Sequence, residues 1–531
     1  MYNSIYMVDK AEIKIYKVGS RHSINLPSAL VTDSAFPFKP NEELIARIDG
    51  KKITGSKTIS STDPSDPRIV VGKVDHADIN GAENALDSLN RGALAWRNVS
   101  FEKRAACIRN AAKLMREQKH DFSALMVREA GKPWAEADAD TAEAIDFCDY
   151  YADEMLRLGP TQLMGNVPGE DNTYFYQPRG VGIVISPWNF PLAITCGMTV
   201  AALVTGNTVA LKPSDQTALI AQKLVDLLYS AGIPGDALAF MPSSGSVVGA
   251  HLVRSPKVDF ICFTGSQEVG LDIIKAAATV EPGQRNVKKV IAEMGGKNAA
   301  IIDEDADLDE AIKGVLASTF SYAGQKCSAC SRAIVVGDVY ETFVERLSNA
   351  ASDIIVGPAV EPSTFLPPVI DTTSQKRLLD QISKAENELP LAYKGEVPEV
   401  GNYVPATIFK DVPATSWLWS EELFGPVLAV TKAKNFEDAL LLANNSPYAL
   451  TGGVYSRSPK NLDLARREFR VGNLYINRKQ TGALVFRQPF GGFKMSGVGS
   501  KAGGPDYLIQ FMEPRTITEN TMRKGFAPLS S

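Results

Sequence analysis

The sequence predicts an α/β protein that contains a doubly wound parallel sheet. Three short apolar runs, VGIVISP (181–187), TVALKPS (208–214) and DFICFTGS (259–266), alternate with stretches of helical character. Strands that are apolar along their whole length are buried on both faces, which is typical of a parallel sheet covered by helices. The run KVIAEMGGKNAAIID (289–303) adds one or two strands, and a second alternating region extends from about residue 308 to residue 477. A chain of 531 residues also predicts two or more domains.

The segments before the first of these strands have a different character. Residues 80–156 carry apolar side chains three and four apart, which predicts helices. The next segment, PTQLMGNVPGEDNTYFYQPRG (160–180), interrupts that pattern, and its TYFYQ alternates like an exposed strand. We therefore expect a hairpin that leaves the main body. The apolar run 192–206 contains three threonines and is too short to cross a bilayer, so we expect a buried helix there.

Composition restricts the class of protein. The net charge is −5 and no dense cluster of Lys and Arg occurs, which argues against a general nucleic-acid binder. Six scattered cysteines do not make a disulfide framework and indicate a reducing compartment. The first residues lack the apolar core of a signal peptide and mix acids with lysines. We expect a cytoplasmic protein, with a mitochondrial matrix location left open. Residues 1–45 show no motif.

Polar residues and glycines follow three of the predicted strands, at 186–189, 212–215 and 264–266. Open parallel sheets bind ligands at the carboxyl ends of their strands, so these segments should meet at one edge. A lysine and an acid directly after a strand can hold ribose hydroxyls, and a helix that starts after Ser266 offers N-terminal amides to a pyrophosphate. Each segment alone could be an ordinary turn, but together they predict a nucleotide site without the usual G-x-G-x-x-G fingerprint.

The stretch GQKCSACSR (324–332) places Cys327 and Cys330 three positions apart. A structural zinc needs four ligands, yet the four histidines are distant in sequence and no second C-x-x-C occurs. A redox dithiol would normally carry other residues between the cysteines. Two readings stay open from position alone: a single activated thiol at Cys327, or two packed cysteines.

Glu293 ends an apolar strand, between VIA and MGGK. A carboxylate in such surroundings is costly unless it has a partner or a task. Burial should raise its pKa toward neutrality, which suits a general base. A buried ion pair is the alternative interpretation.

Seven motifs occur in a characteristic order: SPWNFP, LKPSDQT, FTGSQEVG, EMGGKN, GQKC, EELFGPV and PFGGFKMSG. Together they resemble the aldehyde dehydrogenase superfamily from about residue 50 onward. The stretches GQKCSACSR, TGALV, QPFGG and KAGGPDYL are similar to those of the L-glutamate γ-semialdehyde dehydrogenases, also called Δ1-pyrroline-5-carboxylate dehydrogenases. The resemblance implies a Rossmann-type NAD-binding domain (1–159 and 181–294) and an α/β catalytic domain (295–500). It also implies a β-flap with a C-terminal arm (160–180 and 501–531) that forms a homodimer or higher homo-oligomer.

The resemblance implies how the catalytic residues act. Cys327 would be the nucleophile, and Cys330 a bystander. Asn189 would donate its side-chain amide to the oxyanion, together with the backbone N–H of Cys327. Glu293 would activate water to hydrolyse the thioester. No metal is needed for this chemistry.

The resemblance implies NAD as cofactor, with NADP less expected. Lys212 matches the lysine on the adenosine ribose, and an acid at Asp215 should repel a 2′-phosphate. Gly265 and Ser266 match the pyrophosphate site, and Glu422 and Phe424 match residues on the nicotinamide ribose and ring. The implied cofactor residues are Ser186, Pro187, Trp188, Lys212, Ser214, Asp215, Gly245, Gly265, Ser266, Gly270, Glu422 and Phe424.

For the substrate, the resemblance places a carboxylate on backbone amides and a hydroxyl. The implied substrate residues are Gly482, Ala483 and Ser328 for the carboxylate, Phe190 and Phe490 as flanking aromatics, and Glu143 for the ammonium. A solvated helix face is the alternative for Glu143. Arg487 departs from the family pattern, and if it pointed inward it would add a cation near the carboxylate.

The resemblance thus implies NAD-dependent oxidation of L-glutamate γ-semialdehyde to L-glutamate, the second step of proline degradation. The nearest alternative is the same chemistry on another aliphatic or aromatic aldehyde. A catalytically silent structural relative is a different class, which the presence of Cys327, Glu293 and Asn189 disfavours.

Overall fold

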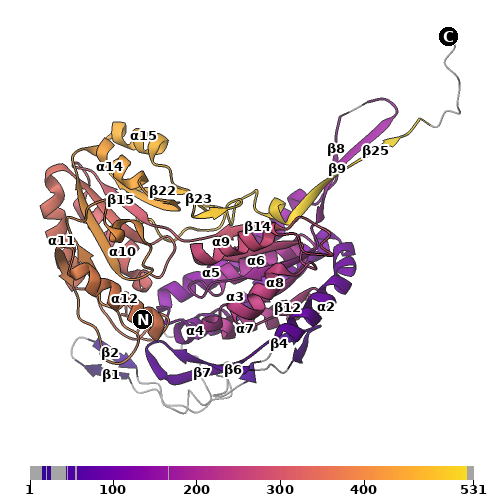
Figure 1. Ribbon diagram of the computed structural model, residues 1–531, viewed down its shortest axis with the longest axis horizontal. Coiled ribbons are helices and arrows are strands. Elements are labelled where there is room, and N and C mark those ends of the chain that lie inside the picture. The colour runs from indigo at the N-terminus through magenta and orange to yellow at the C-terminus, as the bar shows by residue number, and fades with distance from the viewer. Residues whose placement is uncertain are drawn as a thin grey trace, which may run out of the picture.

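The computed structural model describes residues 15–18, 21–24, 43–44, 46–53, 57–165 and 167–522. Two large sheets form separate lobes, and a third, smaller sheet projects from one of them (Figure 1). Residues 523–531 of the expected C-terminal arm lie outside the described residues. No helix in the described ranges is long and apolar enough to cross a bilayer.

The first sheet has eight strands in the order β24-β14-β13-β10-β11-β12-β4-β5. Its five central strands are parallel: β10 (Val181–Ile185), β11 (Thr208–Lys212), β12 (Leu238–Phe240), β13 (Phe260–Thr264) and β14 (Lys289–Glu293). The buried parallel strands are therefore confirmed. The sequence did not predict β12, because three residues are too few to show a period.

Antiparallel strands close both edges of this sheet. They are β4 (Ala46–Ile48) with β5 (Lys51–Ile53) on one side and β24 (Gly497–Val498) on the other. The pairing of β24 with β14 was not expected, because residues 497–498 fall in the sequence that we had assigned to the catalytic domain. A segment from late in the chain can pair with an edge strand and form hydrogen bonds with its unpaired backbone groups. Such a long-range pairing leaves little pattern in the local sequence.

Helices cover the faces of the first sheet. Four helices lie between β5 and β10 in the chain: α2 (Ile79–Asn98), α3 (Phe101–Glu117), α4 (Lys119–Glu129) and α5 (Trp134–Leu158). Four more connect the parallel strands: α6 (Ala193–Val204), α7 (Ala218–Ser230), α8 (Ala250–Arg254) and α9 (Gln267–Ala278). Helix α6 is buried on nearly every side because it packs between the sheet and α5, which explains its unbroken apolar run. The predicted buried helix is confirmed.

The second sheet has the order β17-β18-β19-β16-β15-β21-β22 and is parallel except for β17. Its strands are β15 (Asn298–Ile302), β16 (Cys330–Val336), β17 (Leu391–Lys394), β18 (Thr407–Phe409), β19 (Val427–Ala433), β21 (Thr451–Tyr455) and β22 (Asn473–Ile476). Its helices are α10 (Leu308–Phe320), α11 (Tyr340–Ser352), α12 (Thr372–Glu386), α13 (Trp417–Ser420), α14 (Phe436–Asn444) and α15 (Pro459–Glu468). Neighbours along β15 alternate between two cores, with Ile301 in one and Ile302 in the other.

Smaller elements complete the chain. The remaining strands are β1 (Ile15–Val18), β2 (Arg21–Ile24), β3 (Glu43–Leu44), β6 (Lys57–Asp63), β7 (Asp66–His76), β20 (Tyr448–Ala449) and β23 (Phe493–Lys494). The short helical turns are η1 (Asp215–Thr217), η2 (Gly245–Gly249), η3 (Ser321–Gly324), η4 (Gly337–Val339) and η5 (Leu508–Phe511).

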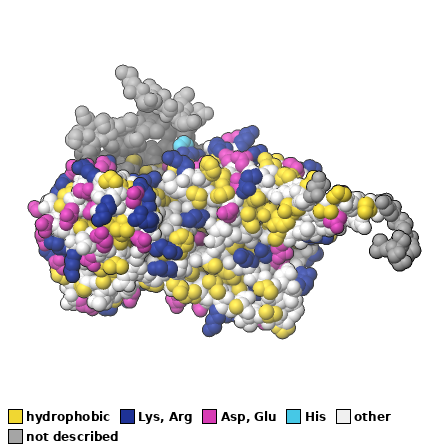
Figure 2. Space-filling view, turned by 90° about the horizontal axis from the view of Figure 1, so that it is seen from above, with side chains coloured by type: hydrophobic (Ala, Val, Ile, Leu, Met, Phe, Trp, Pro, Cys, Tyr) yellow, Lys and Arg dark blue, Asp and Glu magenta, His cyan; other side chains and the backbone are white. Residues whose placement is uncertain are grey.

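The projecting sheet consists of β8 (Gln162–Leu163), β9 (Glu170–Pro178) and β25 (Met512–Asn520). The hairpin that the sequence placed outside the body is confirmed, and β25 pairs with β9 over nine residues (Figure 1). Apolar side chains on this flap are exposed, Leu163 by 83% and Ile517 by 43%. Figure 2 shows apolar side chains gathered toward the base of the flap. Such surface is typical of a protein interface.

Candidate active site

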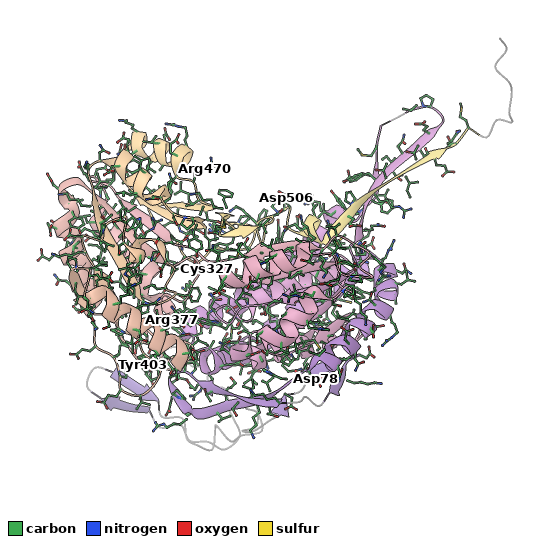
Figure 3. All side chains as sticks on the ribbon, viewed as in Figure 1. Asp78, Cys327, Arg377, Tyr403, Arg470 and Asp506 are labelled. Atoms are coloured by element: carbon green, nitrogen blue, oxygen red, sulfur yellow. The ribbon has the colours of Figure 1, made fainter. Side chains whose placement is uncertain are left out.

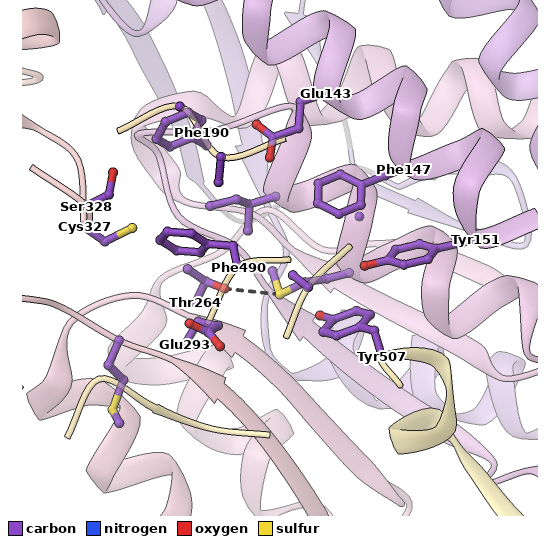
Figure 4. A pocket seen from close by; sticks show the side chains of 17 residues that line it. Glu143, Phe147, Tyr151, Phe190, Thr264, Glu293, Cys327, Ser328, Phe490 and Tyr507 are labelled. Atoms are coloured by element: carbon purple, nitrogen blue, oxygen red, sulfur yellow. Dashed lines mark hydrogen bonds between the residues drawn. The ribbon is translucent and has the colours of Figure 1, made fainter. Parts of the chain in front are cut away.

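A cavity of about 110 Å³ opens next to Cys327, which lies between the two lobes (Figures 3 and 4). Strands β13 and β14 reach it at their carboxyl ends, through Thr264 and Glu293. The wall contains Cys327, Glu293 and all six residues that the resemblance assigned to the substrate: Glu143, Phe190, Ser328, Gly482, Ala483 and Phe490. Six separate segments of the chain therefore meet at one place.

The loop before Cys327 has an unusual backbone. Tyr322 and Ala323 both have φ of +53°, a left-handed conformation that costs free energy in residues with a side chain. Gln325 holds the turn in place, since its amide donates to Tyr322 O at 3.3 Å and accepts from Ile370 N at 2.8 Å. After the turn, Asn298 Nδ2 donates to Cys327 O at 2.7 Å. The loop is fixed on both sides of Cys327 and presents its side chain to the cavity.

The two cysteines of GQKCSACSR are in different environments. Cys330 begins β16, is 1% exposed and belongs to a hydrophobic core, with a thiol whose pKa burial raises to about 12. Cys327 lines the cavity. All six cysteines are free. The reading of two equally packed cysteines therefore does not describe this pair.

The surroundings of Cys327 favour the neutral thiol over the thiolate. Burial raises its pKa above the ordinary value, and the carboxylates of Glu422 and Glu293 raise it further. The backbone N–H groups of Ser328 and Cys327 lower the pKa of this thiol. A single activated thiol at Cys327 therefore stays a prediction, since the side chains that act on the sulfur carry carboxyl groups rather than the cations that lower the pKa of a thiol. Formation of a thiolate requires that a base accept the proton.

Glu293 ends β14 at the cavity wall. Burial raises the pKa of its carboxyl group to about 8, while the positive charge of Lys501 lowers it. Its Oε2 atom is buried and has no hydrogen-bond partner in the part of the chain that the structure describes. The raised pKa agrees with the sequence prediction. A carboxylate with an unsatisfied oxygen beside a cavity can accept a proton from water or from a thiol.

Asn189 is 4% exposed and donates its side-chain amide to Gln325 O at 3.1 Å, two residues before Cys327. Its backbone is held by a buried lysine, since Lys132 Nζ donates to Asn189 O at 2.9 Å. Lys132 also pairs with Asp140 at 2.5 Å and lies 3.8 Å from the ring centroid of Phe190. Asp140 in turn accepts from Ala193 N at 2.6 Å. The sequence analysis did not identify the pair of Lys132 and Asp140, although Lys132 stands in the stretch GKP directly before helix α5.

Helix α5 supplies more of the cavity than the sequence prediction assigned to it. Glu143, Phe147 and Tyr151 recur every four residues on one face, and all three line the cavity (Figure 4). That spacing is visible in the sequence and could have identified the two aromatics. Glu143 is half-buried and lines the cavity, so a solvated helix face is the wrong reading for this residue, and burial raises the pKa of its carboxyl group to about 8.

The loop around Gly482 reaches the cavity through Gly482 and Ala483. Gly482 has φ of +76°, a conformation that favours glycine. Arg487 is exposed and is not part of the cavity wall, so it adds no cation to that wall. The chain turns at Phe486, which has a φ of +65° and contacts the Tyr150 ring with centroids 5.4 Å apart. Residue 487 therefore lies outside the cavity.

A second cleft, of about 640 Å³, lies beside the carboxyl ends of β10 and β11 and is lined by Ile185, Lys212 and Gly245. Lys212 is 5% exposed, and burial lowers the pKa of its ammonium group. Asp215 Oδ1 lies 3.8 Å from Lys212 Nζ, is buried and lacks a hydrogen-bond partner within the described ranges, as does Ser186 Oγ. Unsatisfied polar atoms beside a cleft fit a ligand rich in hydroxyl groups, such as a dinucleotide.

Two further residues that were predicted to bind the cofactor, Ser266 and Gly270, differ in their surroundings. Ser266 caps α9 and accepts from Val269 N at 3.4 Å, which leaves the start of that helix at the sheet edge as predicted. Gly270 does not line the cleft, because it packs against Met294, and a Cβ there would lie 2.5 Å from the Met294 sulfur. His76 was not identified from the sequence, yet its Nε2 lies 3.6 Å from Asp215 Oδ1.

Glu422 and Phe424 reach the region of Cys327 from the second lobe. Glu422 Oε1 accepts from Gly296 N at 2.9 Å, and burial raises the pKa of its carboxyl group to about 7. Phe424 has a left-handed backbone (φ +56°) and contacts Trp188 edge to face, with centroids 5.5 Å apart. Two residues predicted from separate motifs, Trp188 and Phe424, are thus in direct contact.

Comparison with known proteins agrees with this geometry. The chain is 49% identical over 474 residues to a 1-pyrroline-5-carboxylate dehydrogenase of Geobacillus sp. (strain WCH70), and 46% identical to 1-pyrroline-5-carboxylate dehydrogenase 2 of Bacillus subtilis (strain 168). Each alignment covers 89% of this chain and 92% of the relative.

Among solved structures, a 1-pyrroline-5-carboxylate dehydrogenase from Thermus with bound NAD matches at 44% identity and a TM-score of 0.89. That match covers 90% of this chain and 93% of the Thermus chain. Proline utilization A from Bdellovibrio bacteriovorus matches at 49% identity and a TM-score of 0.90, but the chain spans only 51% of that longer protein. The family model described as "Aldehyde dehydrogenase family" matches residues 52–517 of this chain. The chain belongs to the aldehyde dehydrogenase family.

Proposed function

We propose that this protein oxidises L-glutamate γ-semialdehyde to L-glutamate with NAD, the second step of proline degradation. The meeting of Cys327, Glu293 and the six predicted substrate residues in one cavity supports the proposal most strongly. Relatives named 1-pyrroline-5-carboxylate dehydrogenase at up to 49% identity support the substrate. The Δ1-pyrroline-5-carboxylate of that name is a cyclic imine, which takes up one water molecule as its ring opens to the semialdehyde and releases it on closure.

In the proposed mechanism, Cys327 loses its proton and adds to the aldehyde carbon. The amide of Asn189 and the backbone N–H of Cys327 stabilise the resulting oxyanion, and each such donor is worth a few kcal/mol. Oxidation leaves a thioester on Cys327. Glu293 then accepts a proton from the water that hydrolyses it, and a carboxyl group with a pKa of about 8 is well matched to that role.

Lys212, Asp215 and Ser186 would hold the adenosine side of the cofactor, and Glu422, Phe424 and Trp188 the nicotinamide side. When bound, NAD supplies the hydride acceptor. Asp215 would favour NAD over NADP, because its carboxylate can accept from a ribose hydroxyl but repels a 2′-phosphate. We further propose a first domain from 1–159 and 181–294 and a catalytic domain from 295–500, with β24 added to the sheet of the first.

We also propose that the flap of 160–180 and the arm of 501–531 form a homodimer or larger homo-oligomer. The exposed apolar side chains of the flap, such as Leu163 and Ile517, support this assignment. A cytoplasmic location is proposed from the bacterial relatives and the scattered free cysteines.

The test of the proposed function is NADH formation at 340 nm with the purified protein. L-glutamate γ-semialdehyde, propanal and benzaldehyde are offered side by side. We expect kcat/KM for the semialdehyde to exceed the others by about a hundredfold or more, since the polar anchors of the cavity are satisfied only by that substrate. Better turnover of a simple aldehyde would keep the mechanism and contradict the substrate.

The loop of Gly482 and Ala483 should decide substrate choice. Ala483→Leu adds bulk where the substrate carboxylate is expected to lie, so we predict that kcat/KM for the semialdehyde falls about 10- to 100-fold while that for propanal changes less than about twofold. Ala483 is a cleaner position than Gly482, whose positive φ would strain any replacement. Leu484→Ala, at an exposed neighbour outside the cavity wall, is the matched control. An equal loss for both aldehydes in Ala483→Leu would contradict the assigned role.

A further inference from the structure

The segment KAGGPDYL (501–508) has no role in the mechanism above, yet it forms the wall of the cavity behind Glu293. Ala502 and Tyr507 line that wall. Ala502 and Phe490 exchange two backbone hydrogen bonds, of 2.7 and 2.9 Å. Gly503 N donates to the Tyr151 hydroxyl at 2.8 Å. The segment therefore connects the Phe490 loop to the aromatic face of α5.

Lys501 clamps the loop that carries Phe490. Its half-buried ammonium donates to Gly472 O at 2.6 Å, Asn473 Oδ1 at 2.8 Å and Gly491 O at 2.9 Å, with Pro489 O at 3.4 Å. These acceptors are carbonyl and amide oxygens and carry no formal charge. The positive charge of Lys501 is therefore held in place without being neutralised by its direct partners.

Glu293 and Lys501 both approach this loop at Gly491. A Cβ placed on Gly491 would be 2.9 Å from Glu293 Oε1 and 3.3 Å from Lys501 Cα. A larger residue at position 491 would push the carboxylate of Glu293 away from the loop. The charge of Lys501 acts on Glu293, and that of Glu293 on Lys501.

The other titratable groups that face Glu293 stay neutral. They are Cys327 on the nucleophile loop, Cys262 on β13 and Tyr507 directly before η5, and burial raises the pKa of each above its ordinary value. Cys262 reaches about 12. Lys501 is consequently the charged neighbour that can favour the ionised form of Glu293.

We propose that Lys501 is a positioning residue for thioester hydrolysis: it fixes the Phe490 loop next to Glu293 and supplies a positive field that increases the ionised fraction of this carboxyl group. The proposal rests on the proposed role of Glu293 as the base that activates water. It concerns the family reaction and is independent of which aldehyde is the substrate.

The sign of the expected effect follows from the two opposing influences on Glu293. Burial raises the pKa of the carboxyl group, and Lys501 lowers it. Loss of the lysine charge raises the pKa further, so a smaller fraction of Glu293 is ionised at any pH below it. Hydrolysis of the thioester should then slow at low and neutral pH and recover at alkaline pH.

The experiment compares Lys501→Met, Lys501→Gln and Lys501→Arg with the wild type, using propanal, which unlike the semialdehyde has no cyclic form. We measure the pH profile of kcat and the burst of NADH in the first turnover. Lys501→Met and Lys501→Gln should move the acidic limb of the profile upward by about one pH unit, the usual effect of a nearby opposite charge. A burst should also appear, because hydrolysis becomes slower than hydride transfer.

The three variants separate the charge from the clamp. Lys501→Gln keeps hydrogen-bond donors, and Lys501→Arg keeps the charge and should leave the acidic limb in place. Lys494→Met is the matched control, since Lys494 also donates to two backbone carbonyls, Asn444 O and Ser446 O, but at an exposed site outside the cavity wall. It should leave both readouts unchanged.

An unchanged acidic limb in folded Lys501→Met or Lys501→Gln would overturn the proposal, and so would a limb that moves equally in Lys494→Met. An error in the proposed substrate gives a different result. The wild type would not prefer the semialdehyde, while the pH profiles measured with propanal would still report on the role of Lys501.

Discussion

Cys327→Ala is expected to lower kcat for NADH formation by about four orders of magnitude or more, since the nucleophile is the one group that the other catalytic residues cannot replace. The variant should fold normally, because Cys327 lies on the cavity wall and loss of its sulfur opens no void inside a core. The measurement is initial velocity at 340 nm with the semialdehyde and with propanal, alongside a thermal unfolding curve.

Cys330→Ala is the matched control for Cys327→Ala. Cys330 lies three residues away in the same motif, but it is buried in the core of the second sheet. Its replacement should cost some stability, as small core deletions do, and leave kcat within about twofold of the wild type. Equal activity of Cys327→Ala and the wild type would contradict the proposed mechanism as a whole. A comparable loss in Cys330→Ala would mean that the two thiols act together.

Lys132→Met is expected to lower the free energy of unfolding by about 3–5 kcal/mol, because it leaves the buried carboxylate of Asp140 without its partner. Both side chains of the pair are fully buried, and their polar atoms are 2.5 Å apart. Burial lowers the pKa of Lys132 and raises that of Asp140, so each group depends on the other to keep its charge. Denaturant unfolding of the purified variant measures the loss.

The double variant Lys132→Met/Asp140→Leu tests whether this pair also serves the active site. Removing both charges leaves no unpaired ion, so most of the stability should return. The hydrogen bond to Asn189 O and the contact with the Phe190 ring are still lost. We expect a folded protein in which kcat falls more than NAD affinity does. A double variant with normal stability and normal kcat would show that the pair has only a structural role.

Much of the site was predictable from residues that are close together in the sequence. The ends of β10, β11, β13 and β14 are each marked by polar residues or glycines within a few positions, and parallel strands bring such ends to one edge. For this reason Lys212, Asp215 and Glu293 could be selected before the structure was known.

Other features depend on packing that no local pattern records. The charge of Lys501 acts on Glu293 across 208 positions of sequence, and Lys132 donates to Asn189 across 57, so neither interaction leaves a periodic signal. The outward position of Arg487 follows from one left-handed residue before it. The raised pKa of Cys327 follows from its burial and from the carboxyl groups of Glu422 and Glu293, which belong to different lobes.

The sequence by itself determined the two α/β units, the projecting hairpin and the residue types that carry the chemistry, because helix and strand periods and short motifs are local properties of the chain. Only the tertiary structure decided which of these residues face one cavity and which charges act on each other. Burial and electrostatic coupling depend on distances between segments that are remote in sequence, and those distances exist only after the lobes have packed.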